Sequence, residues 1–260
     1  MNGVSGSAQT ALPEGHRLFT IADEPDRWRP LDDLCSSVWP EFMLHSPVAG
    51  AHWDLLRTDW PELQFGLLDA GGRVVAAANA APIAWSGVDA DLPIGWDDQF
   101  VRSAADLAAG RRCESLGALQ IVVANERRGE GLSSVMLAAL RGAASGADRR
   151  TLIACVRPTE KARYPLMPVE DYAAWLRADG FPHDPWLRVH SRAGARIARP
   201  EPRSMTITGT IAEWREWTHL EFPVSGSYVA EGALAPIAID LGADRGVYYD
   251  PNVWMIHEIG

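Results

Sequence analysis

Two kinds of hydrophobic pattern recur along the chain, and each predicts a different element. Apolar residues spaced three or four positions apart predict helices, which we expect at 31–38, 52–58, 96–109, 132–144 and 171–176. Runs that are apolar throughout, or that alternate with polar residues, predict strands, which we expect at 17–21, 63–68, 73–85, 116–123, 151–156, 195–199, 205–208, 235–240, 246–249 and 253–257. Helices and strands therefore alternate up to about residue 200, and strands prevail beyond it.

Turn and cap residues sharpen several of these boundaries. The segment 69–72 (Asp-Ala-Gly-Gly) lies between two strand patterns and predicts a β-hairpin. Asp184 is a favourable N-cap and Pro185 suits a first helical position, so a helix should begin there. Thr210 and Glu213 have the spacing of a capping box, which predicts a second short helix through residue 217.

Composition and the pattern of predicted elements divide the chain into three segments. Residues 1–15 are rich in Gly, Ser and Ala, and we expect them to be flexible. Residues 16–200 hold the regular alternation of elements. Residues 201–260 are rich in strands but show no shift in charge, so we expect an extension packed on the same body.

Composition and charge exclude several classes of protein. An apolar fraction of 47% and a charged fraction of 22% are typical of a globular protein. The formal net charge of −10 disfavours nucleic acids and anionic membranes as partners. Cys35, Cys113 and Cys155 have no metal-binding or disulfide spacing. Without a signal peptide pattern or a membrane-spanning run, we expect a cytoplasmic protein.

The junction between the strand at 116–123 and the helix at 132–144 carries the main chemical signal. It reads Arg128-Gly129-Glu130-Gly131, and two glycines let a ligand approach the main chain. Unpaired N–H groups at a helix start bind anions such as phosphate. A purely structural tight turn is the alternative. The junction lacks both the Gly-Lys-Ser/Thr of a P-loop and the third glycine of a dinucleotide fingerprint.

The same junction resembles the signature of the GNAT acyltransferase superfamily, Q/R-x-x-G-x-G/A, with Glu126 in place of the first residue. The order of elements over roughly residues 17–199 is also similar to that family. The resemblance implies an α/β (α+β) fold with a mixed, mostly antiparallel central sheet, flanked by helices and splayed at one strand pair. The last 60 residues form a β-rich extension outside this common core.

The resemblance also implies acetyl-CoA or another acyl-CoA as co-substrate. The backbone N–H of Val123 or a neighbour would polarise the thioester carbonyl, and the side chain of Glu130 should point outward. Lys161 or Arg163 could meet the adenosine 3′-phosphate, with a solvated surface charge as the alternative. The residues implied to bind CoA are Ile121, Val122, Val123, Arg127, Arg128, Gly129, Glu130, Gly131, Leu132 and Ser133.

Three residues are candidates for proton transfer. His190 occupies the position at which many family members carry a tyrosine that protonates the leaving sulfur, and it could instead be a base or a packed structural histidine. Glu114 is a candidate base, with a solvated carboxylate as the alternative. Tyr164 is a candidate acid, with loop packing as the alternative. Some tryptophans could line an acceptor pocket, the alternative being core packing: Trp85, Trp96, Trp186, Trp214, Trp217 and Trp254.

Three functions follow from these features. The first is an acyl-CoA-dependent N-acyltransferase that acts on a small-molecule or amino-acid-like amine by direct transfer. The stretch Val189-His190-x-x-x-Gly194-Ala195 also resembles GNAT-like domains of polyketide loading modules. A decarboxylase or S-acyltransferase of malonyl-type thioesters, with an acyl carrier protein as partner, is therefore the second. The third is a non-catalytic acyl-CoA-binding protein. Acceptor, acyl length and oligomeric state do not follow from the sequence.

Overall fold

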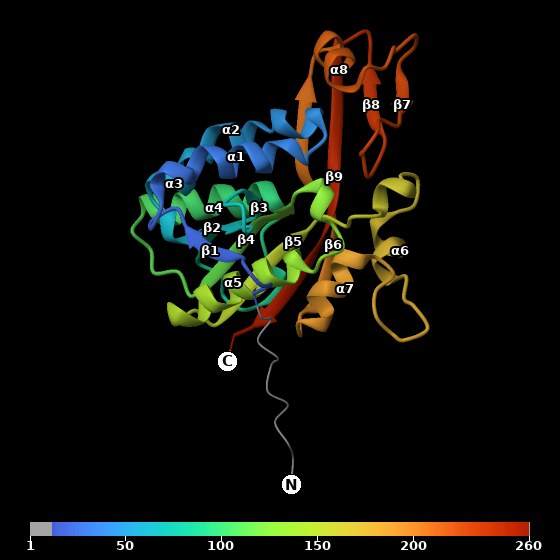
Figure 1. The fold of residues 1–260 in the computed structure, drawn as a ribbon. Coiled ribbons are helices and arrows are strands. Elements are labelled where there is room, and N and C mark those ends of the chain that lie inside the picture. Colours follow the sequence, from blue (N-terminus) through green and yellow to red (C-terminus); the bar gives the residue numbers. More distant parts are fainter. Residues whose placement is uncertain (1–11, 260) are drawn as a thin grey trace.

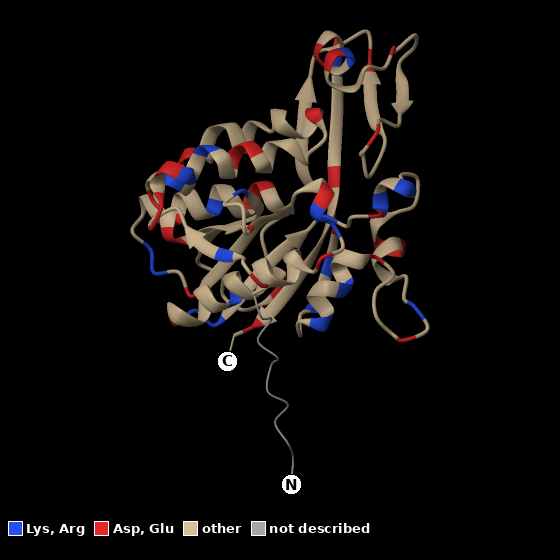
Figure 2. Ribbon diagram, in the orientation of Figure 1, with Lys and Arg blue, Asp and Glu red and all other residues tan. Residues whose placement is uncertain are grey.

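The computed structural model describes residues 12–259 (Figure 1). Most of the segment expected to be flexible, 1–15, thus lies outside the described residues. In Figure 2, acidic and basic positions are interspersed over the body of the molecule. Among the described residues, no helix is long and apolar enough to cross a membrane.

A nine-stranded sheet organises the molecule. Eight strands follow the order β1-β2-β3-β4-β5-β9-β8-β7, and β6 pairs with β9 outside this path. Only β4 and β5 run parallel; all other pairs are antiparallel. The mixed, mostly antiparallel sheet expected from the sequence is therefore confirmed. The strands are β1 (Arg17–Thr20), β2 (Gln64–Leu68), β3 (Val74–Ile83), β4 (Ser115–Val123), β5 (Thr151–Val156), β6 (Arg196–Gly209), β7 (Gly226–Tyr228), β8 (Ile237–Asp240) and β9 (Arg245–Glu258).

Within residues 12–259, eight α-helices flank this sheet (Figure 1), together with short 3-10 turns. The side chain of Ala77 on β3 packs with Leu31 of α1, whereas its neighbours Ala76 and Ala78 belong to the cluster that contains Met136 of α5. Because successive strand residues face opposite sides, α1 and α5 cover opposite faces of the sheet. The helices are α1 (Trp28–Ser37), α2 (Pro47–His52), α3 (Asp54–Thr58), α4 (Trp96–Ala108), α5 (Leu132–Gly146), α6 (Val169–Ala174), α7 (Pro185–Arg192) and α8 (Ile211–Thr218).

The structure confirms the two helix caps and the hairpin turn that the sequence predicts. The Asp184 carboxylate accepts hydrogen bonds from the N–H groups of Trp186 and Leu187 and starts α7. Thr210 and Glu213 form the expected capping box at α8. The hairpin of β2 and β3 turns through Asp69–Gly72, where the N–H of Gly72 donates to the Asp69 carbonyl.

The prediction of short separate strands near the C-terminus is wrong. The strands expected at 195–199 and 205–208 are one strand, β6, and those at 246–249 and 253–257 are one strand, β9. Prolines at 200 and 202 favour a break, because proline has no N–H for a ladder. Pro202 lies where the pairing of β6 with β9 shifts register, between Glu201 and Met205, whereas Pro200 stays in the ladder opposite Val253.

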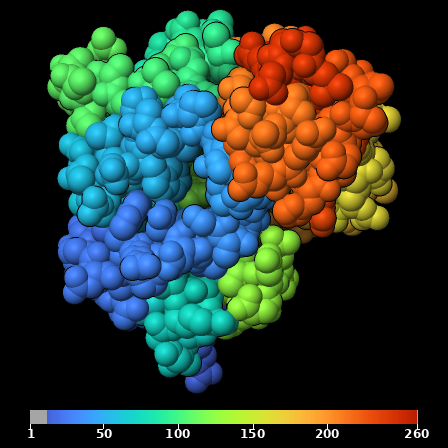
Figure 3. Space-filling model, turned by 90° about the horizontal axis from the view of Figure 1, so that it is seen from above, coloured from blue at the N-terminus to red at the C-terminus, as the bar shows by residue number. Residues whose placement is uncertain are grey.

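Strand β9 joins the C-terminal segment to the central sheet. On one edge, its beginning pairs with β8 and its end, Val253 to Glu258, pairs with β5 (Figure 1). Strand β6 pairs with it along most of its length, from Gly246 to Ile256. Figure 3 shows the C-terminal residues, in orange and red, beside the N-terminal helices, in blue. The two segments are in contact, since the rings of Phe42 and His45 pack against those of Trp214 and Trp217 on α8.

Candidate active site

Strands β4 and β5 separate halfway along their length. They pair from Ser115 and Thr151 only as far as Ala118 and Ala154, although both strands continue. At the same level, the register between β3 and β4 shifts, so that Leu119 is an extra residue in β4. Such a bulge bends a strand and redirects the side chains that follow it. The sheet therefore opens a gap between β4 and β5.

The open edge of β4 presents main-chain groups to this gap. The N–H of Ala124 donates to the carbonyl of Val75 on β3. In an antiparallel pair, residues alternate between bonding the partner strand and pointing their N–H and C=O groups away from it. Since β4 keeps one register with β3 over this stretch, Val123 and Ile121 point theirs toward the gap. An extended ligand could therefore pair with this edge as a strand does.

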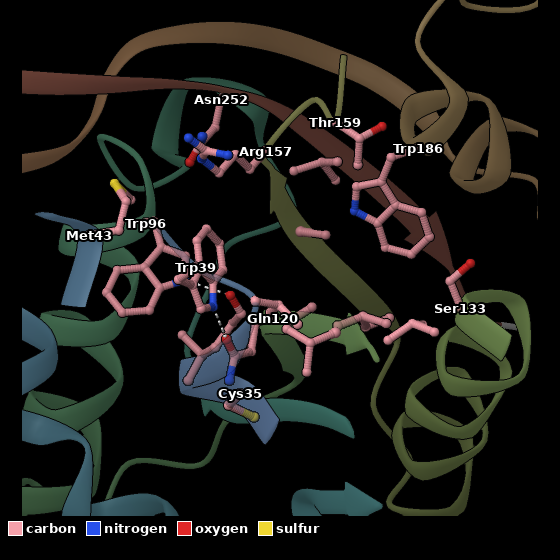
Figure 4. Close-up of a pocket in the computed structure, with 18 of the residues that line it drawn as sticks. Cys35, Trp39, Met43, Trp96, Gln120, Ser133, Arg157, Thr159, Trp186 and Asn252 are labelled. Carbon is pink, nitrogen blue, oxygen red and sulfur yellow. Dashed lines mark hydrogen bonds between the residues drawn. The ribbon is translucent and has the colours of Figure 1, made fainter. Parts of the chain in front are cut away.

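A cavity of about 900 Å³ extends from the gap in two directions (Figure 4). We call the first direction the glycine end; Arg128, Gly129, Gly131, Ser133 and Trp186 line it. The second is the tryptophan end, which is lined by Asp32, Trp39, Trp53, Trp96, Gln120 and Arg157. Figure 4 shows Ser133 and Trp186 on the side opposite Trp39 and Trp96.

The glycine end has the geometry of an anion site. Gly129 and Gly131 have φ angles of 88° and 78°, a left-handed backbone that favours glycine. α5 begins directly after them, and no side chain caps its first turn. The N–H groups at the start of this 15-residue helix therefore face the cavity with the positive end of the helix dipole behind them.

Arg127, which the family resemblance implies as a CoA-binding residue, is paired with carboxylates instead. Arg127 donates to both carboxylate oxygens of Glu130, at 2.8 and 2.9 Å, and its Nη1 lies 3.4 Å from Asp69. The carboxylates of Glu130 and Asp69 therefore compensate the charge of Arg127, and these contacts stabilise the glycine loop. Arg128 is exposed at the cavity and makes no ion pair within residues 12–259. Glu126, at the family's Gln or Arg position, pairs with Arg73 at 2.9 Å.

The expected contact of Lys161 or Arg163 with a CoA phosphate is not supported. Lys161 is buried, and its Nζ donates to the carbonyls of Tyr164 and Leu234 at 2.7 and 2.8 Å. Burial lowers the pKa of Lys161. Arg163 is exposed, lies 3.6 Å from Glu160, and does not line the cavity.

His190 on α7 lines the cavity and pairs with a second histidine. Its Nδ1 lies 2.9 Å from Nε2 of His257 on β9, and both side chains are buried. The edge of its ring packs against Trp186. Burial lowers the pKa of His190 well below its usual value, and His257 adds to this effect. His190 is therefore neutral near pH 7.

The hydrogen bond between the two histidines couples their tautomers, because one ring must donate and the other accept. Burial lowers the pKa of His257 to about 4, so it too is neutral. The backbone of Ala193 opposes this lowering of the pKa, but Nδ1 of His257 has no hydrogen-bond partner among residues 12–259. A proton on Nδ1 of His257 leaves its Nε2 to accept a hydrogen bond from Nδ1 of His190. Nε2 of His190 is then an unprotonated nitrogen.

The cavity brings together most, but not all, of the residues implied by the sequence. Those that line it are Ile121, Val122, Val123, Arg127, Arg128, Gly129, Gly131, Leu132, Ser133 and His190. Glu130 does not line it; its side chain points out to Arg127, as expected. Of the candidate tryptophans, Trp96 and Trp186 line the cavity, whereas Trp214 and Trp254 are fully buried.

The structure does not bring Glu114 or Tyr164 to the cavity. Glu114 precedes β4 at the end opposite the gap and lies 3.6 Å from Arg150. At about 3.3 Å per residue, Gln120 on β4 is about 20 Å away from it. The ring of Tyr164 packs against Tyr172 and Trp175 instead.

Apart from Trp96, sequence reasoning missed the residues that shape the tryptophan end. Trp39 donates to Gln120 at 2.8 Å, and Gln120 donates to Asn79 at 2.8 Å. Trp53 donates to Asp32 at 2.9 Å. These contacts join residues far apart in the chain, and no spacing within the sequence signals them.

A splayed strand pair, a glycine loop at a helix N-terminus and a cavity that extends beyond both are features of an acyl-CoA-dependent acyltransferase. The arginine N-acetyltransferase avaD of Aspergillus versicolor is 32% identical to this chain and matches over 96% of each protein. No family model matches the sequence. The chain belongs to the GNAT superfamily, and it is an N-acyltransferase that uses an acyl-CoA as co-substrate and acts on an amine.

Two solved structures share the fold. The loading GNATL domain of CurA from Lyngbya majuscula superimposes with a TM-score of 0.58 at 16% identity, over 94% of this chain and 98% of that one. The GphF GNAT-like decarboxylase, in complex with isobutyryl-CoA, gives 0.56 at 20% identity, over 94% and 99%. The fold expected from the glycine junction is thus confirmed.

Proposed function

We propose that the protein transfers the acetyl group of acetyl-CoA to a nitrogen of a small, arginine-like molecule. The observation that carries this proposal is the full-length similarity to an arginine N-acetyltransferase. The cavity supports it, because the tryptophan end offers space for a small acceptor beyond the gap between β4 and β5.

We assign CoA to the glycine end and the open edge of β4. The pyrophosphate would accept hydrogen bonds from N–H groups between Arg128 and Ser133, with the Arg128 guanidinium nearby. The pantetheine would run along Ile121 and Val123. The N–H of Val123 would then polarise the thioester carbonyl, because it points into the gap.

We assign proton transfer to His190. The acceptor nitrogen attacks the thioester carbon, a C–N bond forms, and the carbonyl oxygen takes the electron pair. The unprotonated Nε2 of His190 accepts the proton that the nitrogen releases. When the C–S bond breaks, His190 returns this proton to the sulfur, and free CoA leaves. A neutral histidine is suited to begin this sequence as a base, and Glu114 and Tyr164 are too far from the cavity to share it.

A calorimetric titration with acetyl-CoA and a product assay with arginine test the proposal together. We expect binding, and a product heavier than arginine by one acetyl group in mass spectrometry. Absence of binding by acetyl-CoA and by longer acyl-CoAs contradicts it. Release of CO₂ from malonyl-CoA, or acylation of a carrier protein, would instead favour the loading-domain chemistry. A carrier-protein partner and a cytoplasmic location stay predictions.

A further inference from the structure

We propose that Asp32 binds the cationic group of the acceptor, a guanidinium, at the tryptophan end of the cavity. This inference rests on the proposed function for its acceptor class. Its physical basis is separate, because it depends on a charge and on aromatic rings that the assignment of CoA does not use.

The side chain of Asp32 reaches the cavity because of its place on α1. Asp32, Cys35 and Ser36 all line the cavity, and their spacing of three and four puts them on one side of α1. Trp39, two residues beyond the end of α1, lines the cavity as well. Asp33, the next residue, is exposed and does not line the cavity. α1 therefore presents one of two adjacent carboxylates to the interior.

The charge of Asp32 is uncompensated. Its Oδ1 accepts the hydrogen bond from Nε1 of Trp53, which leaves Oδ2 available. Between residues 12 and 259, no arginine, lysine or histidine forms an ion pair with it. A carboxylate in a half-buried pocket with a neutral donor as its partner favours a cation as the remaining ligand.

The other charges of the tryptophan end do not offset that of Asp32. Arg157 lies over the ring of Trp39, 5.5 Å from its centre. Its Nε is 3.0 Å from both carboxylate oxygens of Asp250, which is fully buried and also accepts from Tyr248 and Asn252. Arg157 and Asp250 thus compensate each other, and the net charge that faces the tryptophan end is negative.

Hydrogen bonds hold the three indole rings that line the tryptophan end. Trp53 donates to Asp32, Trp39 to Gln120, and Trp96 donates to the carbonyl of the bulge residue Leu119 at 2.6 Å. A planar guanidinium stacks on such rings and pairs with a carboxylate at once, which a compact ammonium does less well. The pocket therefore favours a guanidinium over an uncharged group of the same shape.

Arginine and citrulline test this inference, because citrulline replaces the guanidinium by a neutral urea of almost the same size. Binding of each is measured by calorimetry with CoA present, for the wild type, Asp32→Asn and the control Asp33→Asn. Asparagine keeps an acceptor for Trp53 and removes only the charge. We expect the wild type and Asp33→Asn to bind arginine more tightly than citrulline.

Asp32→Asn should lower the affinity for arginine by about 10- to 100-fold, the loss expected for a hydrogen bond to a charged group, and leave that for citrulline unchanged. Its kcat/KM for arginine should fall similarly, with an unchanged Kd for acetyl-CoA. Equal losses for both ligands, no loss, or a wild type that binds arginine no better than citrulline would overturn the assignment of Asp32. Failure of acetyl-CoA to bind would instead overturn the proposed function, since Asp32 lies at the other end of the cavity.

Discussion

The buried histidine pair should make the stability of the protein fall steeply below pH 6.5. In the unfolded chain both imidazoles take up protons near their ordinary pKa of about 6.5. In the folded protein His257 resists protonation down to about pH 4, and His190 is shifted in the same direction. The unfolded state therefore binds more protons in this window, and the free energy of unfolding decreases as the pH falls.

The size of the effect follows from the shift of His257. A change from 6.5 to about 4 corresponds to about 3 kcal/mol in full. Between pH 7 and pH 5, about 2 kcal/mol of this is lost. Protonation of His190 adds to the loss. Because 2 kcal/mol is a large share of the stability of a typical domain, the midpoint of urea unfolding should move visibly.

The assay is urea unfolding at half-unit steps between pH 7 and pH 5, followed by tryptophan fluorescence. His257→Gln puts a neutral amide close to the position of Nε2. Between pH 7 and pH 5, its free energy of unfolding should therefore fall by about 2 kcal/mol less than that of the wild type. His183→Gln is the matched control, because His183 stacks on Trp175 outside the cavity and its loss leaves the buried pair intact. A wild-type slope equal to that of His257→Gln would refute the pKa reasoning.

Three further predictions concern the cavity. Gly129→Glu should abolish binding of acetyl-CoA in calorimetry, because it puts a negative side chain at the phosphate site and strains the backbone at a positive φ. The control Gly180→Glu has a similar φ of 80° but lies outside the cavity, so it should retain binding. His190→Gln should lower kcat by about 10²- to 10⁴-fold, the usual contribution of a general base, with an unchanged Kd for acetyl-CoA; a loss confined to KM would contradict the role of a base. With burial holding the pKa of His190 well below 6.5, the pH profile of kcat/KM should show no acid limb from this residue near pH 6.5.

The glycine end of the cavity was predictable because its determinants are contiguous. The strand, the loop with Gly129 and Gly131, and the helix follow one another within about 30 residues, and each has a local signature. Asp184 and Pro185 at α7 are equally local, and they fix where the helix that carries His190 begins. Such patterns can be recognised without knowledge of the tertiary structure. Helix caps and positive φ angles depend on the local backbone, which restricts the residue types at those positions.

The tryptophan end was not predictable, because its contacts join distant positions. Trp39 and Gln120 are 81 residues apart, and His190 and His257 are 67 apart. Nothing in the sequence near His190 indicates that another histidine will set its tautomer. The wrong expectation for Lys161 has the same origin, since its burial depends on the carbonyl of Leu234, 73 residues away.

The C-terminal strands contribute to the site as well as to the fold. β9 pairs with β5 on the side of the sheet next to the gap, and it carries His257 behind His190. The same strand carries Asp250, which accepts hydrogen bonds from Arg157 at the tryptophan end and from Asn252 on β9 itself. A single strand therefore supports both the proposed base and the wall of the acceptor pocket. The segment beyond residue 200 lies outside the element order that the glycine junction implies, yet its His257 and Asp250 hold two residues that line the cavity.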